Sequence, residues 1–544
     1  MMRFLPANLD AVLVELDDLP QTLSLFASLQ AEPITGVEEL VPAAHTLLVR
    51  FHPWQIACET LVERIRARRL DAPVERADTL IEIPVTYDGA DLDDVARTLG
   101  VSPAEVIRRH TADTWTVAFA GFAPGFAYLS GGDRGLDVPR HATPRTRIPA
   151  GAVGLAGAFS CVYPKASPGG WQIIGTTALS MWDLSREWPA LLQPGFRVRF
   201  VDAARDTGSG TRTRVSVADT AASEAASARR HAPDSAEPPA LPPGTAALRV
   251  RQAGLQALFQ DAGRPGQARQ GVSASGAIDR TAWRAANRLV GNTADTACIE
   301  VAYGGLRFKC EGDVVVAFTG APAPIELVTA DGLRSPLPFH EAVALSQDDS
   351  VALGVPMVGC RTYVAVRGGF DCAPVLGSRA TDTLAHLGPP PIAAGDVLPV
   401  HSVTLGAIVG LPEAPPLDLP SAAEVVTLDI VMGPRTDWFT PEAVTLLANQ
   451  EWTVTPRSDR VGLRLAGERP LERSDPTELP SEGTVLGALQ IPPNGQPVLF
   501  LADHPLTGGY PVIAAVATHH LDRAGQIPIG ARVRFNPTQP FGDS

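Results

Sequence analysis

The first 80 residues alternate between two hydrophobic patterns. The apolar runs at 11–16 (AVLVEL) and 46–51 (TLLVRF) are short and rich in β-branched residues, as strands are. Residues 20–30 and 52–69 instead carry apolar positions at helical spacing. We therefore predict a small α+β domain over residues 1–80.

From residue 81 the pattern changes to short strands separated by turns. It runs from IEIPVTYD at 81–88 to RVRFVD at 197–202, with helices predicted at 91–99 and 103–110. Frequent Gly and Pro mark the turns. This pattern predicts a β-barrel over residues 81–205.

A change of composition separates this barrel from the rest of the chain. Residues 206–245 consist mainly of Ala, Ser, Thr, Pro and charged residues, and no aromatic residue occurs between Phe200 and Phe259. Such a segment cannot bury enough apolar surface to fold by itself. We predict a disordered linker over 206–245.

The remainder is again mostly short strands, and a Pro-rich stretch near 411–423 divides it into units at 246–411 and 424–540. The segment LQPGFRVRF in the first half is echoed by QIPIGARVRF near the end, with AAGDVLPV at the corresponding place between them. This weak repetition predicts three related β-barrel units. The predicted fold class is mainly β with α+β.

Composition excludes several classes of protein. The net charge is −14 and no basic run occurs, which argues against nucleic-acid binding. No apolar run approaches the ~20 residues of a membrane-spanning helix, and the N-terminal residues lack the apolar stretch of a signal peptide. We expect a soluble cytoplasmic protein with no membrane partner.

Cysteine and histidine spacing predicts no metal site. The six cysteines form no C-x-x-C pair, and the 11 histidines form no H-x-x-x-H or H-E-x-x-H pattern. His519 and His520 are adjacent, and adjacent residues of a strand point to opposite faces. The only two lysines, Lys165 and Lys309, lie neither in a phosphate-binding G-K-[ST] loop nor between methionines as a biotinylated lysine would.

The stretch 119–177 is the most informative part of the chain. Glycines and prolines recur every few residues among aromatic residues and arginines. Gly permits close backbone approach and Pro fixes the chain, so such loops are rigid and can direct N–H groups at an anion. A β domain with many tight turns would look similar, but the clustered Arg, aromatic and His residues favour a binding surface.

Specific motifs resemble two known families. Residues 1–205 resemble the KipI-like (allophanate hydrolase subunit 1) family through IPVTYDGADLDDVA, GFAPGFAYL, PRHATPRTRIPAGAVGLAG and YPKASPGGWQIIGTT. Residues 248–540 resemble the KipA-like (subunit 2) family through QDAGRPGQARQGVSASGAIDRTAWRAANRLVGN, LGSRATD, SDRVGLRLAG and SEGTVLGALQIPPNGQPVLFLADHPLTGGYP. The chain therefore resembles a fusion of both families.

The resemblance implies three cyclophilin-like β-barrels and a role in bacterial 5-oxoprolinase. There the two proteins, its B and C subunits, join a LamB/YcsF-like A subunit, and the assembly opens 5-oxoproline to L-glutamate with ATP as co-substrate. The same modules form the carboxyltransferase part of biotin-dependent urea carboxylase. His504, Pro505 and Leu506 stand where many relatives have Arg, Gln and Thr, which affects ligand choice near Thr507.

The chemistry implied by the resemblance needs a cationic clamp for an anion, fixed N–H donors and a proton-transfer group. We expect His110 to be an acid/base or orienting residue. The alternative is a residue at a helix end, near the helix dipole. The predicted catalytic residues are His110, Arg140, Arg145, Asp261, Arg264 and Asp279.

The predicted substrate-binding residues come from both halves. They are Gly125, Phe126, Tyr128, Gly169, Gly170, Trp171, Gln260, Ser275, Asn287, Arg460, Arg464, Gln490, Thr507 and Tyr510. Structural roles compete for each: the glycines and aromatics could form turns and core, and the arginines could be solvated strand residues. Arg264 could pair with Asp261, and Asp279 could satisfy the free amides at a helix start.

The leading hypothesis is a fused B and C component of an ATP-dependent 5-oxoprolinase, active only with its LamB/YcsF-like partner on a cyclic amide. The absence of a biotin-carrier lysine favours it over a self-sufficient urea carboxylase. A carboxyltransferase served by separate biotin proteins remains an alternative, as does a non-enzymatic regulator of a sensor histidine kinase. The oligomeric state is open, a homo-oligomer included.

Overall fold

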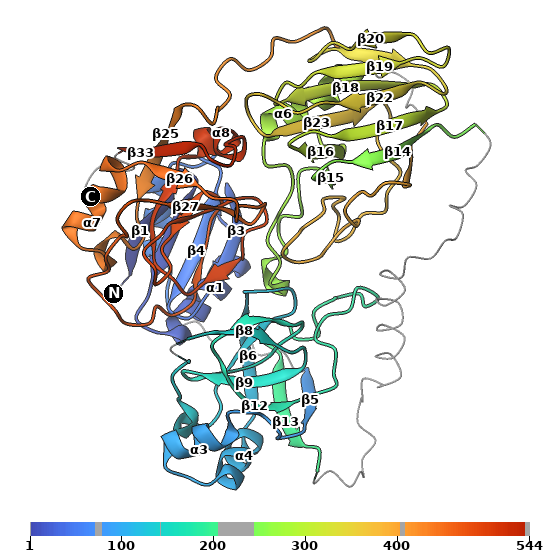
Figure 1. Ribbon diagram of the computed structural model, residues 1–544. Helices are drawn as coiled ribbons and strands as arrows, with labels where there is room; N and C mark the ends of the chain where they lie inside the picture. The colour runs from blue at the N-terminus through green and yellow to red at the C-terminus, as the bar shows by residue number, and fades with distance from the viewer. Residues whose placement is uncertain (1, 71–78, 142, 205–243, 403–407, 539–544) are drawn as a thin grey trace.

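The computed structural model describes residues 2–70, 79–141, 143–204, 244–402 and 408–538. Three β units and a small N-terminal domain make up the molecule (Figure 1). The N-terminal domain lies against the last unit, although these are the two ends of the chain. The segment predicted as a linker lies almost entirely outside the described residues.

The N-terminal domain is a four-stranded antiparallel sheet with two helices. Its strand order is β1-β2-β4-β3, and β2 shows why residues 11–14 (AVLV) are all apolar. Val12 and Val14 pack against the helices, whereas Leu13 faces the last barrel. The elements are β1 (Arg3–Asn8), β2 (Ala11–Glu15), α1 (Leu19–Ala31), β3 (Val37–Pro42), β4 (Thr46–Phe51) and α2 (Cys58–Arg66).

The second unit is built on a seven-stranded sheet of order β12-β9-β10-β7-β6-β13-β5. Its edge strands meet again through a bridge between Thr86 and Thr176, so the sheet curls round its apolar core. Its elements are β5 (Leu80–Val85), α3 (Leu92–Leu99), α4 (Pro103–Ala112), β6 (Trp115–Ala120), β7 (Ala127–Ser130), η1 (Arg134–Leu136), β8 (Arg145–Ile148), β9 (Ala152–Ala156), β10 (Phe159–Val162), β11 (Ser167–Gly169), β12 (Gln172–Thr176) and β13 (Arg197–Asp202).

The third unit consists of two sheets that enclose one core. Their orders are β20-β19-β22-β17-β14-β24 and β15-β16-β23-β18-β21, and both contribute to a single apolar cluster. The strands are β14 (Ala247–Ala253), β15 (Gln256–Gln260), β16 (Cys298–Ala302), β17 (Leu306–Glu311), β18 (Val314–Gly320), β19 (Ile325–Val328), β20 (Arg334–Pro336), β21 (Ala342–Leu345), β22 (Ser350–Leu353), β23 (Arg361–Val366) and β24 (Val397–Pro399).

The 3₁₀ turn η2 (Ala268–Gln270) and the helix α6 (Arg280–Val290) lie between β15 and β16. The side chain of Asp279 caps the start of α6 by accepting the Ala282 N–H, and Gly291 ends it in the left-handed conformation (φ 73°). The helix start considered for Asp279 is therefore present.

The last unit is a closed barrel of order β25-β32-β29-β30-β27-β26-β33. Its first and last strands pair in parallel, as β5 and β13 do in the second unit, which accounts for the repeated RVRF. Its elements are β25 (Val425–Met432), η3 (Thr436–Trp438), α7 (Pro441–Asn449), β26 (Trp452–Val454), β27 (Gly462–Ala466), β28 (Glu482–Gly483), β29 (Ala488–Gln490), β30 (Val498–Phe500), β31 (Thr507–Gly508), β32 (Val512–Val516), η4 (Thr518–His520), α8 (Leu521–Gly525) and β33 (Arg532–Thr538).

The fold class predicted from the sequence is confirmed: the molecule is mainly β, with barrel units and an α+β N-terminal domain. One local prediction is wrong. His519 and His520 lie on the 3₁₀ turn η4 instead of a strand, and their rings approach to 4.5 Å. Within the described ranges, no helix is both long and apolar enough to cross a membrane.

Candidate functional site

A cleft lies between the second unit and the last barrel. It has two neighbouring chambers of about 590 Å³ and about 460 Å³. Both are lined by Phe122, Pro168 and the segment 507–510, so they adjoin along that segment. We name them the aromatic chamber, lined by Tyr128 and Trp171, and the lysine chamber, lined by Lys165.

Aromatic rings in tilted and edge-on contact build the wall of the aromatic chamber. The ring of Trp171 lies 5.6 Å from that of Tyr128, and Phe126 packs edge-on against both from behind. The Arg140 guanidinium lies 5.8 Å from the Trp171 ring and forms an ion pair with Glu478 of the opposite wall at 2.8 Å. This wall can stack a planar group and hold an anion beside it.

A strained turn places the residues at the junction of the chambers. Phe122 has φ 64°, a conformation that a bulky residue adopts rarely and at a cost. Its N–H donates to Thr507 Oγ1 of the last barrel at 3.0 Å. A Cβ on the neighbouring Gly121 would lie 2.3 Å from the same oxygen, so only glycine fits there.

The lysine chamber is lined mainly by apolar groups, with two cations and a histidine. Lys165 Nζ donates to the Leu384 carbonyl at 2.5 Å, and burial lowers the pKa of this amine. Arg464 on β27 is exposed and has no ion-pair partner among the described residues. His504 also lines this chamber.

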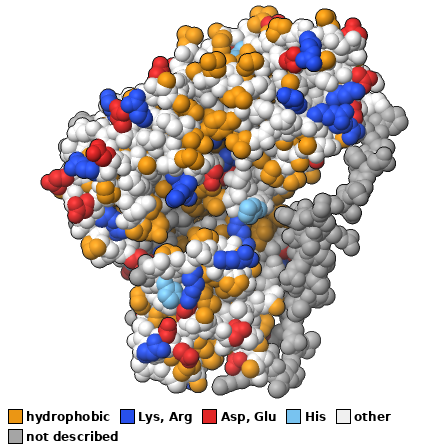
Figure 2. Space-filling view, viewed as in Figure 1, with side chains coloured by type: hydrophobic (Ala, Val, Ile, Leu, Met, Phe, Trp, Pro, Cys, Tyr) orange, Lys and Arg blue, Asp and Glu red, His pale blue; other side chains and the backbone are white. Residues whose placement is uncertain are grey.

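The cleft carries positive charge although the whole chain is acidic. Its lining includes Lys165, Arg140, Arg464 and Arg473, against the single carboxylate of Glu478. Figure 2 shows Lys and Arg side chains beside the hollow where the units meet. With a net charge of −14 for the chain, this concentration of cations suits an anionic ligand.

Contacts between the two halves fix the cleft walls. Gly125 N–H donates to the Gln270 carbonyl at 2.8 Å, and the Tyr128 hydroxyl hydrogen-bonds Ser481 Oγ at 3.0 Å. Lys165 adds its bond to Leu384. The cleft therefore belongs to the assembled molecule.

The structure brings many of the predicted binding residues together in this cleft. Gly125 and Phe126 stand behind its wall as turn and packing residues. The predicted residues that line the cleft are Tyr128, Arg140, Gly169, Gly170, Trp171, Arg464, Gln490, Thr507 and Tyr510.

His110 lies outside the cleft. It is completely buried on α4, with its ring stacked on Phe200 at 4.1 Å and its nitrogens 2.8 Å from the Tyr87 hydroxyl and 2.9 Å from Ser160 Oγ. Burial lowers the pKa of His110 to about 3. Its location corrects the expected acid/base role to one in the core of the second unit.

Arg145 does not line the cleft either. Both of its terminal nitrogens donate to the Asp91 carboxylate at 2.6 Å in a bidentate pair. Burial raises the pKa of Asp91, but hydrogen bonds from Arg145, Ile173 N–H and His141 outweigh it and leave the pKa lowered. Arg145 is therefore neutralised by Asp91 and lies outside the cleft, which corrects its predicted place among the catalytic residues.

Gln260, Asp261 and Arg264 hold the loop at 375–382. Gln260 and Asp261 hydrogen-bond to backbone and hydroxyl groups of that loop, and Arg264 donates to two of its carbonyls. Arg264 forms its ion pair with Asp382, at 3.9 Å, and not with Asp261, which was the structural alternative for this residue. All three side chains are buried and none lines the cleft, which corrects their expected catalytic and binding roles.

Asp279 and Asn287 belong to the packing of α6. Asp279 caps the helix and also accepts from Gln526 Nε2 at 2.7 Å, and Asn287 donates to the Thr296 carbonyl at 2.8 Å. Burial is the main cause that raises the pKa of Asp279 to about 7. Both residues are buried outside the cleft, so the structural alternative holds for Asp279.

Ser275 and Arg460 join the third unit to the last barrel. Arg460 donates to Asp503 at 3.0 Å and forms an ion pair with Glu300, and Ser275 Oγ donates to Asp503 at 2.6 Å. The exposed fraction of Arg460 is 1%. These residues form a buried network and do not reach the cleft.

Several cleft residues were missed by sequence reasoning. Lys165 and Phe122 lie within the motifs YPKASPGG and GFAPGF, and Arg473 lies beside the aromatic chamber. Phosphate-loop and biotin patterns do not include Lys165. The position of a lone lysine in a Gly/Pro-rich motif was the available signal.

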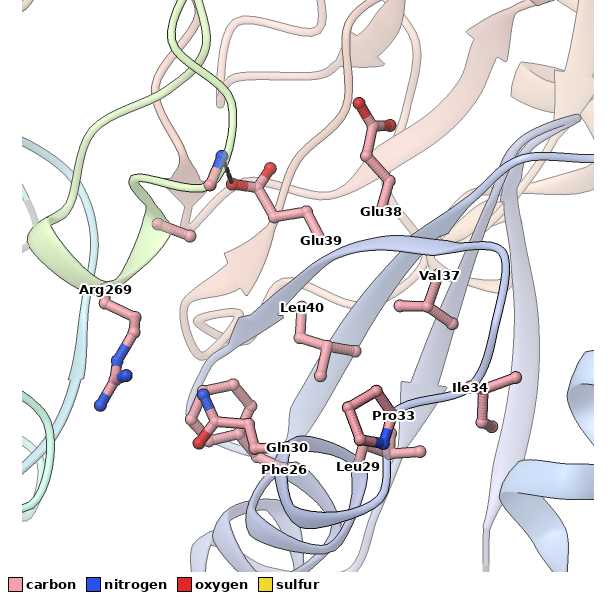
Figure 3. A pocket seen from close by; sticks show the side chains of 12 residues that line it. Phe26, Leu29, Gln30, Pro33, Ile34, Val37, Glu38, Glu39, Leu40 and Arg269 are labelled. Atoms are coloured by element: carbon pink, nitrogen blue, oxygen red, sulfur yellow. Dashed lines mark hydrogen bonds between the residues drawn. The ribbon is translucent and has the colours of Figure 1, made fainter. Parts of the chain in front are cut away.

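A second hollow, of about 250 Å³, lies between α1, β3 and the turn at 266–269, with Arg269 on one wall (Figure 3). Its lining is mainly apolar, and Glu39 accepts the Gly266 N–H at 3.1 Å, the dashed bond in the figure. We interpret it as a gap in packing.

Asp429, His519 and His520 place three ligand atoms within 4.8 Å of one another. His520 Nδ1, however, accepts the backbone N–H of Asp429 at 2.9 Å, so that its lone pair is occupied. Asp429 is further held by Asn536 at 2.7 Å. The group therefore does not offer three free ligand atoms.

Two families match the chain. Carboxyltransferase domain, subdomain C and D, matches residues 2–192, and carboxyltransferase domain, subdomain A and B, matches residues 270–537. The 5-oxoprolinase B subunit of Escherichia coli O157:H7 is 41% identical over 170 residues, covering 30% of this chain and 78% of the relative. The 5-oxoprolinase C subunit of Escherichia coli K12 is 31% identical over 297 residues, covering 53% of this chain and 90% of the relative.

Two further proteins are similar to this chain. Urea amidolyase of Lachancea kluyveri is 31% identical over 313 residues, which cover 54% of this chain but 17% of the relative. The crystal structure of TTHA0988 is 32% identical with a TM-score of 0.78, covering 98% of this chain and 100% of that chain. A protein of solved structure therefore matches both halves of this chain, in the same order, over its full length.

Proposed function

Because the two halves of this chain belong to the families of the 5-oxoprolinase B and C subunits, joined in one polypeptide, we propose that it is the B–C component of an ATP-dependent 5-oxoprolinase. The observation that carries the proposal is the cation-lined cleft, whose walls come from both halves. The substrate, 5-oxoproline, is a small anion with a planar lactam. ATP, the co-substrate, is a larger anion with a planar base.

The two chambers suit these two substrates. The aromatic chamber has rings against which a base can stack, with Arg140 and Arg473 available for phosphates. The lysine chamber is smaller and mostly apolar, with Lys165 and Arg464 available for a carboxylate. The segment 507–510 lines both chambers, and there the lactam oxygen would meet the terminal phosphate of ATP.

The proposed reaction has three balanced steps. The lactam oxygen bonds to the γ-phosphorus as the bond from that phosphorus to ADP breaks. One water adds to the activated carbon, and the ring C–N bond breaks as the nitrogen takes protons, which leaves an acyl phosphate. A second water releases phosphate and L-glutamate. Cations and fixed N–H donors around the cleft stabilise the negative charge that moves during phosphoryl transfer.

We further propose that the reaction needs the LamB/YcsF-like A subunit. The test measures glutamate and ADP formed from 5-oxoproline and ATP by the purified chain, with and without that partner. Glutamate formation only in the mixture, in proportion to ADP, supports the proposal. No turnover by a mixture in which the partner is demonstrably bound contradicts it.

A second candidate function is a carboxyltransferase served by separate biotin proteins, acting on urea or a related amide. The observation that favours it is the match of both halves to carboxyltransferase domains, shared with urea amidolyase. Avidin separates the two functions, because it captures biotin and would abolish only the carboxyltransferase. A 5-oxoprolinase reaction would be indifferent to avidin and dependent on the LamB/YcsF-like partner.

A further inference from the structure

His504 is a half-buried histidine in the wall of the lysine chamber. It follows β30, and its ring stacks on Phe500 at 5.8 Å with an interplanar angle of 15°. The stack and the flanking chain fix the plane of the ring. None of the steps proposed above uses this residue.

The hydrogen bonds of His504 determine which nitrogen carries the proton. Nδ1 lies 2.9 Å from the Pro505 carbonyl oxygen and 3.2 Å from Thr484 Oγ1, and the Thr484 hydroxyl itself donates to the same carbonyl. A carbonyl oxygen can only accept, so Nδ1 must carry the hydrogen. In the neutral ring, Nε2 is then an acceptor, and it has no hydrogen-bond partner among the described residues.

The ring stays neutral under physiological conditions. Burial is the main cause that lowers the pKa of His504 to about 4, and it outweighs the hydrogen bond to the Pro505 carbonyl, which acts in the opposite direction. The two cations of the chamber, Lys165 and Arg464, can only donate hydrogen bonds. A fixed acceptor in the same chamber as such donors selects a ligand that has both an anionic group and an N–H.

We propose that Nε2 of His504 accepts the N–H of the substrate amide and makes the site select amides over esters. The proposal rests on the proposed function, since it assigns the amide to the lysine chamber. A lactam places its N–H beside the carbonyl that reacts, so this bond would orient the ring as well as select it. A ligand without an N–H would cover this acceptor and leave it without a partner, at a cost.

The test compares two ligands that differ in one group. One is 5-oxoproline, and the other is its lactone analogue, 5-oxotetrahydrofuran-2-carboxylate, which has oxygen in place of N–H. Calorimetry with the full chain and its bound partner gives both dissociation constants. We expect the wild type to bind the lactam about 10- to 100-fold more tightly than the lactone, as the loss of one buried hydrogen bond implies.

Variants of His504 test whether this side chain causes the ratio of the two dissociation constants. His504→Leu removes the acceptor, so the ratio should fall to near unity, and His504→Gln keeps an acceptor oxygen and should keep most of the ratio. His401→Leu is the matched control, because His401 is an exposed histidine that does not line the cleft and its loss should leave the ratio unchanged. Thermal melting shows that each variant is folded.

The outcomes separate this inference from the proposed function. Normal binding of 5-oxoproline with an unchanged ratio in folded His504→Leu overturns the inference alone. A wild-type ratio near unity overturns it without any variant. Failure of 5-oxoproline to bind the wild-type complex overturns the proposed function, and this inference with it.

Discussion

Replacing Arg460 by Met tests whether this arginine holds the molecule together or binds substrate. The guanidinium donates to both oxygens of Asp503 at 3.0 Å, to the Gly276 carbonyl at 2.7 Å and to Glu300. Arg460 and Asp503 belong to the last barrel, whereas Glu300 on β16 and Gly276 belong to the third unit. The network therefore joins two units through buried charge.

The size of the effect follows from what the substitution leaves behind. The carboxylates of Asp503 and Glu300 are exposed by no more than 3%. Asp503 loses its ion-pair partner without gaining water, whereas Glu300 keeps Arg361 at 3.6 Å. Breaking a buried pair in this way costs about 3–5 kcal/mol of unfolding free energy. Met fills much of the vacated space, so little of that cost comes from a cavity.

The dependence on pH has a definite sign. Burial raises the pKa of Asp503, but Arg460 and hydrogen bonds outweigh it, so the pKa is lowered and ionised Asp503 stabilises the wild type above the unfolded-state pKa. In Arg460→Met, burial dominates and the pKa of Asp503 rises above the unfolded value. Protonation of Asp503 then removes the unpaired buried charge as the pH falls. The difference in unfolding free energy between wild type and variant should therefore be smaller at pH 5.5 than at pH 7.5.

Urea unfolding followed by tryptophan fluorescence measures the effect at both pH values. Arg464→Met is the matched control, since Arg464 is exposed four residues further on and its loss should change stability by less than about 0.5 kcal/mol. An Arg460→Met protein as stable as wild type, yet inactive, would refute this reasoning. It would return Arg460 to the substrate-binding role predicted from the sequence.

Three further predictions concern the cleft and the core. Arg140→Ala should raise the KM for ATP about 10- to 100-fold in the glutamate assay with the partner, because a charge-assisted bond is lost. The KM of Arg140→Lys should lie between those of wild type and Arg140→Ala. His110→Gln should flatten the loss of stability at acid pH: the folded pKa of about 3 lies below the ordinary 6.5, so wild type loses about 1.4 kcal/mol per pH unit below 6.5, measured by urea midpoints. Gly121→Ala should slow turnover by pushing Thr507 away, and adding Thr507→Ala, which removes the atoms that lie at 2.3 and 2.7 Å, should restore part of the rate.

Local elements could be predicted from the sequence because each depends on neighbours in the chain. The helix that starts after Asp279 and ends at Gly291 carries its own capping signals. The packing of β2 against the last barrel has no such local signal, because Leu13 packs in one cluster with residues such as Val485 and Phe500, more than 470 positions away. An apolar run shows that both faces are covered but does not identify what covers them.

The same limit explains which of the predicted site residues line the cleft and which do not. The Gly, Pro and aromatic clustering around Trp171 indicates a shaped surface whatever lies opposite, and that surface is the cleft wall. The local sequence around His110, at a helix end, is the same whether the side chain faces solvent or Ser160, which follows 50 residues later. The local sequence around Arg460 is likewise the same whether the side chain binds a ligand or Glu300, which lies 160 residues earlier. Charge in a motif predicts that a partner exists, not which one.

The arrangement of the cleft gives a physical reason for joining the two halves. Lys165 and Arg140 come from the first half, and Arg464, His504 and the segment 507–510 come from the second. Neither half alone offers the complete set of cations and acceptors, so two separate chains would form the site only at concentrations that favour their complex. In Escherichia coli the relatives of the two halves are separate proteins. In one chain their association is intramolecular, which raises the effective concentration of each half for the other and leaves the geometry of the cleft to direct contacts such as that of Phe122 with Thr507.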